Sequence, residues 1–236
     1  MTKGQDAPRF TVEFGKDGPP PEDGRLDAPA FHRNHAAIAP VLEAFLRNRT
    51  GDVLEIGSGT GQHAVAFAHR FPGIAWWPTD LNDNHLRSIA AWRAYAKLPN
   101  VQAPVPLDAS LSDWRLRERN LPASFVTIFC ANVIHIAPWT VAEGLFAGAA
   151  RHLVADGRLF LYGPFRRNGE HTAPSNAAFD ESLRSRNPEW GVRDIADLKK
   201  LGESNGLRLV ELIEMPSNNA ILVFERKPQA ESFQAK

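Results

Sequence analysis

Short apolar runs alternate with amphipathic stretches along most of the chain. The runs are rich in β-branched and aromatic residues, which is typical of strands buried on both faces. The stretches between them repeat apolar residues at helical spacing. Strands are predicted at 52–57, 74–77, 101–107, 125–131 and 158–162, and helices at 60–71, 86–95, 141–153, 175–186 and from the capping residue Asp194 to Ser204. This alternation predicts an α/β fold with a doubly wound, mostly parallel sheet.

Prolines modify the pattern in two places. Residues 28–49 show helical spacing, but Pro40 lies among the apolar positions and predicts two short helices in place of one long one. Pro104 and Pro106 predict that the strand over 101–107 is short and irregular.

The last two predicted strands run in opposite directions. Apolar runs at 207–214 and 220–226 are joined by Met-Pro-Ser-Asn-Asn at 215–219, which predicts a hairpin. The sheet is therefore expected to have seven strands, with an antiparallel last strand.

A glycine loop joins the first strand of the sheet to the next helix. Gly57, Gly59 and Gly61 occupy alternate positions there, and such a loop brings backbone amides and a helix N-terminus to a nucleotide-like ligand. A dinucleotide-binding loop would place its third glycine at position 62, which is Gln62. The order Glu55-x-Gly57-x-Gly59-x-Gly61 instead resembles motif I of class I S-adenosylmethionine (SAM) methyltransferases.

That resemblance implies a cofactor role for the loop. It places Gly57, Ser58, Gly59, Thr60 and Gly61 against SAM, with Glu55 supporting the loop and the methionine end. Glu55 is otherwise an incidental strand charge, although a carboxylate in an apolar strand is costly without a partner. The reversed last strand fits the same superfamily, whereas a dinucleotide-binding domain normally has six parallel strands.

Polar residues follow the other strands at their carboxyl ends, where ligands bind in α/β sheets. Asp80, next to Leu81, is a candidate for the ribose hydroxyls; the alternative is that it caps the next helix. Asp108, next to Ala109, suits the adenine amino group or is a turn residue. Asn132 follows the central strand and is expected to hydrogen-bond the cofactor or the acceptor.

Further motifs narrow the resemblance. They are Arg33-Asn34, the glycine loop, Asn132 to Trp139 (NVIHIAPW), Tyr162 to Phe165 (YGPF), Asn168-Gly-Glu170, Ser175-Asn176, Arg186 to Asp194 (RNPEWGVRD) and Met215 to Asn219 (MPSNN). In this order they resemble the methyltransferase-like protein 26 family over residues 27–226. The resemblance implies a class I SAM-dependent methyltransferase fold without a settled substrate. Two departures are the proline-rich arm before Asp27 and Ser124-Phe-Val, where the family tends to carry an acid.

Methyl transfer needs an aligned nucleophile, and a base only if the acceptor must lose a proton. His135 is the candidate base, because its ordinary pKa suits proton transfer near neutral pH; the alternative is a loop anchor. Asn132 is the second candidate at the reacting atoms. The signature Asn-Pro-Pro-Tyr does not follow this strand, which disfavours methylation of adenine or of a glutamine amide.

Residues 163–193 are expected to form the acceptor lid, since aromatic and hydrogen-bonding side chains are mixed there. The candidate acceptor contacts are Asn34, His135, Tyr162, Phe165, Asn168, Asn176, Trp190 and Arg193. The alternative for several of them is a structural role, in which they hold the segment 163–193 in place. Arg33 is expected to close the cofactor pocket, or to lie on the surface.

Composition limits the remaining possibilities. The 236 residues carry 27 basic and 27 acidic side chains, a balance that disfavours nucleic acid as partner. A single cysteine, Cys130, excludes an internal disulfide, and neither it nor His63 and His69 have metal-ligand spacing, so no metal is expected. No apolar run suggests a leader or a membrane span, so the cytoplasm is the expected compartment.

The expected organisation is a flexible Pro/Gly-rich arm over 1–26 and one domain over 27–236, working as a monomer or homodimer. The expected function is SAM-dependent methyl transfer to an O, N or S nucleophile of a small molecule, with S-adenosylhomocysteine (SAH) as product. The alternatives are a non-catalytic SAM-binding protein that acts through partners, and a nicotinamide oxidoreductase. The last is disfavoured by Gln62 and by the antiparallel ending.

Overall fold

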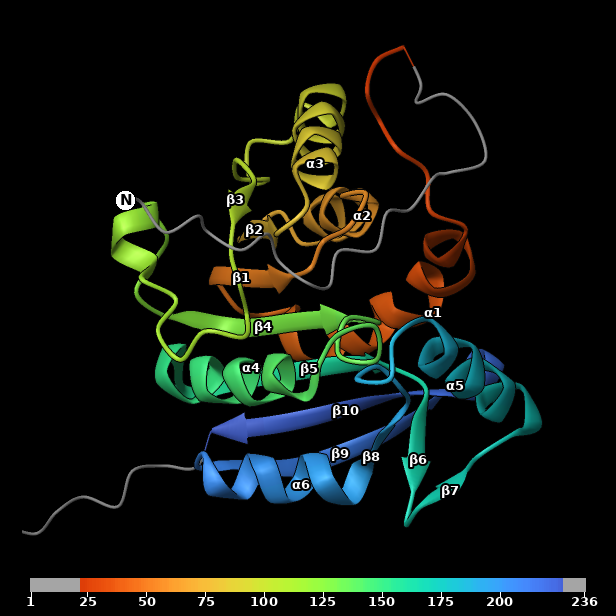
Figure 1. Ribbon diagram of the computed structural model, residues 1–236. Coiled ribbons are helices and arrows are strands. Elements are labelled where there is room, and N and C mark those ends of the chain that lie inside the picture. Colours follow the sequence, from red (N-terminus) through yellow and green to blue (C-terminus); the bar gives the residue numbers. More distant parts are fainter. Residues whose placement is uncertain (1–21, 227–236) are drawn as a thin grey trace, which may run out of the picture.

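A seven-stranded sheet forms the centre of the protein (Figure 1). The computed structural model describes residues 22–226, in which the strand order is β3–β2–β1–β4–β5–β10–β9. The strands are β1 (Gly51–Ile56), β2 (Ile74–Asp80), β3 (Val105–Pro106), β4 (Phe125–Ala131), β5 (Leu153–Gly163), β9 (Leu207–Met215) and β10 (Asn219–Arg226). Only β10 runs against its neighbours, pairing antiparallel with both β5 and β9. The predicted fold and reversed last strand are confirmed.

Helices cover both faces of the sheet. They are α1 (Pro29–Leu46), α2 (Gln62–Arg70), α3 (Asp83–Ala96), α4 (Trp139–His152), α5 (Pro174–Arg186) and α6 (Ile195–Ser204), with 3-10 turns at Leu116–Arg119 and Pro216–Asn218. Successive strand residues point to opposite faces, so Leu54 packs with α4 and α6 while Val53 packs with α1 and α2. Each buried Leu or Phe in these two layers stabilises the fold by about 1.5–3 kcal/mol.

The prediction of two short helices around Pro40 was wrong. Helix α1 continues through Pro40 without a break. Pro40 and Ala36 both lie on the exposed side of the helix, so water can reach the Ala36 carbonyl that lacks a helical N–H partner. The opposite side buries Ile38 and Leu42, and this packing holds the helix together.

Three strands differ markedly in length from the predicted ranges, and the first of them, β2, continues beyond residue 77 to Asp80. β5 begins at Leu153, ahead of its predicted start at residue 158, because residues 154–157 are absorbed as an irregularity in the pairing with β4. The prolines shorten β3 to two residues, as predicted, and a single bridge between Trp76 and Val101 continues its line.

The segment 163–193 contains a second, small sheet that was predicted as a loop. Strands β6 (Phe165–Arg167), β7 (Glu170–His171) and β8 (Arg193–Asp194) pair in the order β7–β6–β8 and flank α5 (Figure 1). Asn168 and Gly169, both with positive φ, turn the chain between β6 and β7. Asn-Gly is a strong hairpin signal, so this turn was readable from the sequence.

The end of the predicted N-terminal arm contacts the domain. Residues 1–21 lie outside the described part of the chain. The Leu26 N–H donates to Ser88 Oγ at 2.9 Å, and the Leu26 carbonyl accepts from Trp92 Nε1 at 2.8 Å. The Arg25 guanidinium lies 3.6 Å from the centre of the Tyr95 ring. Within residues 22–226, no helix has the length and apolar character needed to cross a bilayer.

Candidate functional site

The glycine loop requires two of its glycines for steric reasons. Gly57 has φ of 65°, and a Cβ there would lie 2.5 Å from Val133 Cγ2. Gly61 has φ of 90°, and its Cβ would lie 2.8 Å from the Cα of Ile89 on α3. Glycine adopts such backbone angles without the penalty that other residues incur. The loop therefore lies flush against α3 and the segment after β4.

Hydrogen bonds join the loop to its surroundings. The Ser58 N–H donates to the Thr79 carbonyl at 2.8 Å, and the Thr79 N–H donates to Ser58 Oγ at 3.1 Å. Ser88 Oγ donates to the Thr60 carbonyl at 2.8 Å. These bonds fix the loop between β2 and α3.

Gln62, the first residue of α2, connects the loop to the chain before α1. Its Oε1 accepts from Thr60 Oγ1 at 2.9 Å and from the Ala28 N–H at 2.8 Å. Its Nε2 donates to Asp27 Oδ1 at 2.6 Å. One buried amide thus uses both ends to hold two segments that are far apart in sequence.

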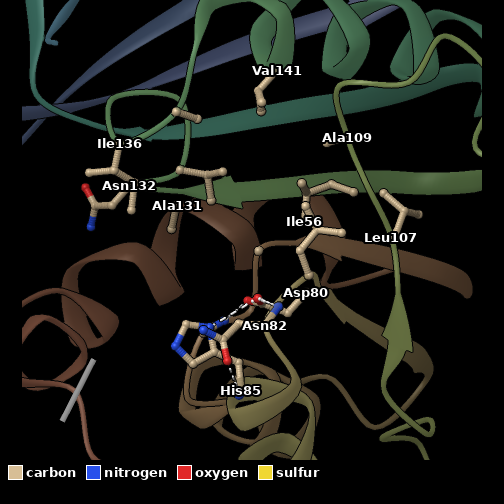
Figure 2. Close-up of a pocket in the computed structure, with 15 residues that line it drawn as sticks. Ile56, Asp80, Asn82, His85, Leu107, Ala109, Ala131, Asn132, Ile136 and Val141 are labelled. Carbon is tan, nitrogen blue, oxygen red and sulfur yellow. Dashed lines mark hydrogen bonds and ion pairs between the residues drawn. The ribbon is translucent and has the colours of Figure 1, made fainter. Parts of the chain in front are cut away.

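Asp80, at the end of β2, faces the loop (Figure 2). Its Oδ2 accepts from the Gly59 N–H at 2.8 Å, and its Oδ1 accepts from the Asn82 N–H at 2.9 Å and contacts His85 Nδ1 at 3.1 Å. The cap of α3 is Asn82, whose side chain accepts from the Asn84 N–H at 2.8 Å. Three of about four acceptor sites on the Asp80 carboxylate are used, which leaves capacity for one more donor.

A first pocket of about 110 Å³ opens between the loop and the strand ends. Figure 2 shows Asp80 on one side of it, with Val141, Ile136 and Asn132 across from it. Six predicted cofactor residues line it: Gly57, Gly59, Asp80, Leu81, Ala109 and Asn132. The other lining residues are Ile56, Asn82, His85, Leu107, Ala131, Val133, Ile136, Ala137 and Val141. Most of them lie at or shortly after a strand end, which was their signal in the sequence, whereas His85 and Val141 lie on helices α3 and α4.

Glu55 and Asp108, two predicted cofactor contacts, do not line this pocket. Glu55 Oε2 accepts from Trp76 Nε1 at 2.6 Å inside the sheet, where burial raises the pKa of the Glu55 carboxyl to about 8. Asp108 Oδ1 accepts from the Ser110 N–H at 2.9 Å and from Ser110 Oγ at 2.6 Å. The turn role that the sequence left open for Asp108 is the one seen here. Ser58, Thr60 and Gly61 shape the loop but are also outside the lining.

Helix α4 fixes the far wall of the first pocket. A Cβ at Gly144 would lie 2.1 Å from the Ala109 carbonyl oxygen, so only glycine allows the helix to approach this closely. The Ala109 segment therefore rests directly on the helix.

A second pocket of about 350 Å³ lies between α1, α5 and the end of β5. Five predicted residues line it: Arg33, Asn34, Asn132, Tyr162 and Asn176. Arg33 was assigned to the cofactor, but it lines this pocket and not the first. The additional lining residues are Ala30, Ile136, Pro164, Phe179, Leu183, Arg186, Pro216, Ser217 and Asn219. Those on α5 belong to the segment predicted as a lid.

Hydrogen bonds orient two of the amides in the second pocket. Asn34 Oδ1 lies 2.8 Å from His63 Nε2, which leaves the Asn34 amino group for other partners. Asn176 Nδ2 donates to Thr172 Oγ1 at 3.0 Å and to the Asn218 carbonyl at 2.9 Å. Burial raises the pKa of Tyr162, so its hydroxyl stays protonated at neutral pH.

The two pockets share Asn132 and Ile136 in their linings. Asn132 has φ of 59°, a left-handed conformation that asparagine tolerates better than most residues. The sequence predicted that this residue hydrogen-bonds the cofactor or the acceptor, and it is the predicted residue that lines both pockets.

His135 lines neither pocket. Its ring is 5.4 Å from that of Phe165, centre to centre, and a Cβ at Gly163 would lie 2.1 Å from its Nε2. Neither ring nitrogen has a hydrogen-bond partner within residues 22–226. Burial lowers the pKa of the imidazole to about 3. The imidazole of the predicted base is thus buried and reaches neither pocket.

Arg193 holds the segment that contains His135 in place through hydrogen bonds. Its guanidinium donates to the carbonyls of Ile134 at 2.9 Å, Glu189 at 2.9 Å and Ala137. This is the structural role that the sequence left open for several lid residues. Phe165, Asn168 and Trp190 likewise lie outside the linings of both pockets.

Other reactive chemistry is limited in the part of the chain that the structure covers. No three His, Cys, Asp or Glu side chains gather there as a metal site. Cys130 is buried in β4, and burial raises the pKa of its thiol to about 12. This thiol therefore stays protonated and is a poor nucleophile.

Comparisons place the chain among known proteins. A family described as "Protein of unknown function (DUF938)" matches residues 25–226. An O-methyltransferase family protein from Burkholderia thailandensis superposes with a TM-score of 0.68 at 14% identity, over 85% of this chain and 58% of that one. Magnesium protoporphyrin IX methyltransferase (ChlM) from Synechocystis PCC 6803 with bound SAH gives 0.62 at 16% identity, over 84% of both chains.

SibL, an S-adenosylmethionine-dependent methyltransferase, gives a TM-score of 0.67 at 19% identity, over 84% of this chain. The present chain spans 56% of the length of SibL. At these identities the likeness establishes the fold, which is the Rossmann-like fold of class I methyltransferases.

Proposed function

This chain belongs to the DUF938 family, and we propose that it is a SAM-dependent methyltransferase that acts on an O, N or S nucleophile of a small molecule. The narrower kinship with the methyltransferase-like protein 26 family is part of the proposal and rests on the motifs quoted above. The fold and the glycine loop support a nucleotide-like cofactor. The balanced charge supports the absence of a nucleic-acid partner. A cytoplasmic monomer or homodimer without membrane partners is part of the proposal.

The observation that carries the proposal is the junction of the two pockets at Asn132 and Ile136. A methyl donor in the first pocket and a methyl acceptor in the second would meet at these two residues. Methyl transfer is an in-line displacement at a carbon that the sulfonium already activates, so alignment and exclusion of water supply most of the catalysis. Two adjoining pockets with a shared wall meet that requirement.

The first pocket suits the parts of SAM. Its apolar walls, formed by residues such as Leu81, Leu107 and Val141, match the faces of an adenine ring. Asp80 has acceptor capacity for a ribose hydroxyl. The glycine loop supplies backbone amides at the N-terminus of α2, where a helix favours negative charge such as the methionine carboxylate.

The second pocket offers positioning groups but no base. Among its described lining residues there is no His, Asp or Glu, and the protonated Tyr162 hydroxyl can donate a hydrogen bond. This composition favours an acceptor whose nucleophilic atom already exposes a lone pair near neutral pH. It also supports the alternative proposal, a SAM-binding protein without catalysis.

The test begins with the purified full chain. Calorimetry with SAM and SAH should show binding, and incubation with a metabolite extract and methyl-deuterated SAM should give SAH together with a product heavier by one labelled methyl group. Binding without SAH formation in any extract would favour the non-catalytic alternative. Tight binding of NADH with no binding of SAM would reject both.

A further inference from the structure

The charges in the second pocket are all of one sign. Arg33 on α1 and Arg186 at the end of α5 line it, and no Asp or Glu is among its described lining residues. The protein as a whole has equal numbers of acidic and basic side chains, so this local excess is not a consequence of composition.

The two arginines are not neutralised by acids in the described part of the chain. No carboxylate within residues 22–226 lies within 4.0 Å of either guanidinium, and Arg186 Nε donates only to the Ser182 carbonyl at 3.3 Å. Arg184, two residues earlier on the same helix, is paired with Asp180 at 3.0 Å.

Two acids on the neighbouring helices are paired elsewhere, and a third, Glu181 on α5, does not line the pocket. Asp180 accepts from the Val192 N–H at 2.6 Å in addition to its pair with Arg184. Glu43 on α1 is paired with Arg47 and Arg70. The charge of the second pocket therefore stays positive.

The remaining polar groups add donors, and the rest of the wall is apolar. Asn34 contacts His63 through its amide oxygen, so its amino group is left as a donor beside Tyr162, whose hydroxyl is protonated. Phe179, 38% exposed, and the buried Leu183 present apolar surface from α5. Guanidinium groups pair with carboxylates in bidentate geometry, which a cation or a neutral amide cannot reproduce.

We propose that the methyl acceptor is a small organic acid, with its carboxylate held by Arg33 and Arg186 and its aromatic or aliphatic body against Phe179 and Leu183. This inference rests on the proposed function, whose acceptor class it names. The same guanidinium pair would hold a phosphate monoester, so the test includes that chemistry.

Calorimetry on the full chain, with and without saturating SAH, would compare matched probes. The panel consists of aromatic and aliphatic carboxylates of three to ten carbons and their primary amides, including 4-hydroxyphenylacetate with 4-hydroxyphenylacetamide, plus phenyl phosphate and the cation tyramine. At least one acid should bind about tenfold more tightly than its amide, as expected for hydrogen bonds between charged groups. Tighter binding of phenyl phosphate than of every carboxylate would contradict the carboxylate assignment.

Variants locate the binding. Arg33→Gln and Arg186→Gln should each weaken the acid by about five- to tenfold and leave the amide unchanged. Arg117→Gln makes the same charge change at an exposed site outside both pockets and should leave both affinities unchanged. The inference is overturned if no acid exceeds its amide, if tyramine binds best, or if both pocket variants keep wild-type affinity.

The two proposals can fail separately. SAM and SAH affinities, measured first, test the cofactor. If neither binds, the proposed function fails, whereas the comparison of acid with amide without SAH still decides whether the second pocket selects anions.

Discussion

The Asn132 N–H donates to the Tyr162 carbonyl across 2.9 Å, and this bond joins the ends of β4 and β5 where the two pockets meet. The backbone of Asn132 has a left-handed conformation at this point. The position thus has two separable properties, its backbone angle and its amide side chain.

Substitutions at Asn132 should separate these properties. Asn132→Gly keeps the backbone angle without strain and removes the amide, so turnover should fall by about tenfold or more while unfolding by urea is little changed. Asn132→Ala removes the amide and adds a backbone penalty, and it should also lose about 1 kcal/mol of unfolding free energy. Equal stability of the two variants would contradict the backbone argument, and wild-type turnover in Asn132→Gly would remove the amide from the site.

Asp80→Asn should weaken SAM binding by about 1–3 kcal/mol, because the carboxylate accepts from the loop and is available to a ribose hydroxyl. Isothermal calorimetry measures this directly. Asp108→Asn is the matched control, since Asp108 lies in a turn outside the first pocket. A loss at Asp108 as large as that at Asp80 would restore the adenine role that the sequence suggested.

His135→Phe should leave turnover within a few-fold of the wild type, since His135 lines neither pocket. A general base typically contributes 10²- to 10⁴-fold to the rate. The rate of SAH formation between pH 6 and 9 is the measurement. A hundredfold drop in a variant that still melts at the wild-type temperature would reinstate His135 as the base.

Stability should have its maximum near pH 6.5. The buried His63 and His135 have pKa values lowered to about 3 from 6.5, so between these values the unfolded state binds more protons and the free energy of unfolding rises with pH. The pKa of Glu55 is raised to about 8 from 4.5, so over that range the folded state binds more protons and the free energy of unfolding falls. Below pH 6.5 the two histidines change the free energy of unfolding more than Glu55 does, so stability rises with pH. Between pH 6.5 and 8 the contribution of Glu55 remains, so stability falls.

Urea titrations from pH 5 to 8.5 would check this dependence. The expected decline from pH 6.5 to 8 is on the order of 1.4 kcal/mol per pH unit. Glu55→Gln keeps an acceptor for Trp76 and should abolish the decline. The same slope in this variant would show that another group causes it.

The sequence predicted the parts of the protein that rest on local pattern. The strand at 125–131 and the reversed hairpin followed from apolar runs and turn residues, and the glycine loop with Asp80 followed from spacing. Pro40 shows the limit of such rules, because the rule against proline in a helix gives way when the proline faces water and the opposite side of the helix packs well.

The acceptor side could not be assigned in the same way. Tyr162, Asn34 and Arg186 come together only because α1, β5 and α5 converge, and no spacing within the sequence reports that convergence. The placement of His135 is likewise not readable from the sequence. Its ordinary pKa suggested catalysis, while its burial against Gly163 is a property of the packed structure.

Gln62 stands where a dinucleotide-binding loop has its third glycine, and its side chain also anchors Asp27 and Ala28. One residue thus distinguishes the type of loop and fixes the path of the chain into α1. Replacing it with glycine would create the dinucleotide spacing but release the chain before α1. Conversion of this loop to another class of ligand therefore requires coordinated changes in two distant segments, which makes the present ligand class hard to alter by single substitutions.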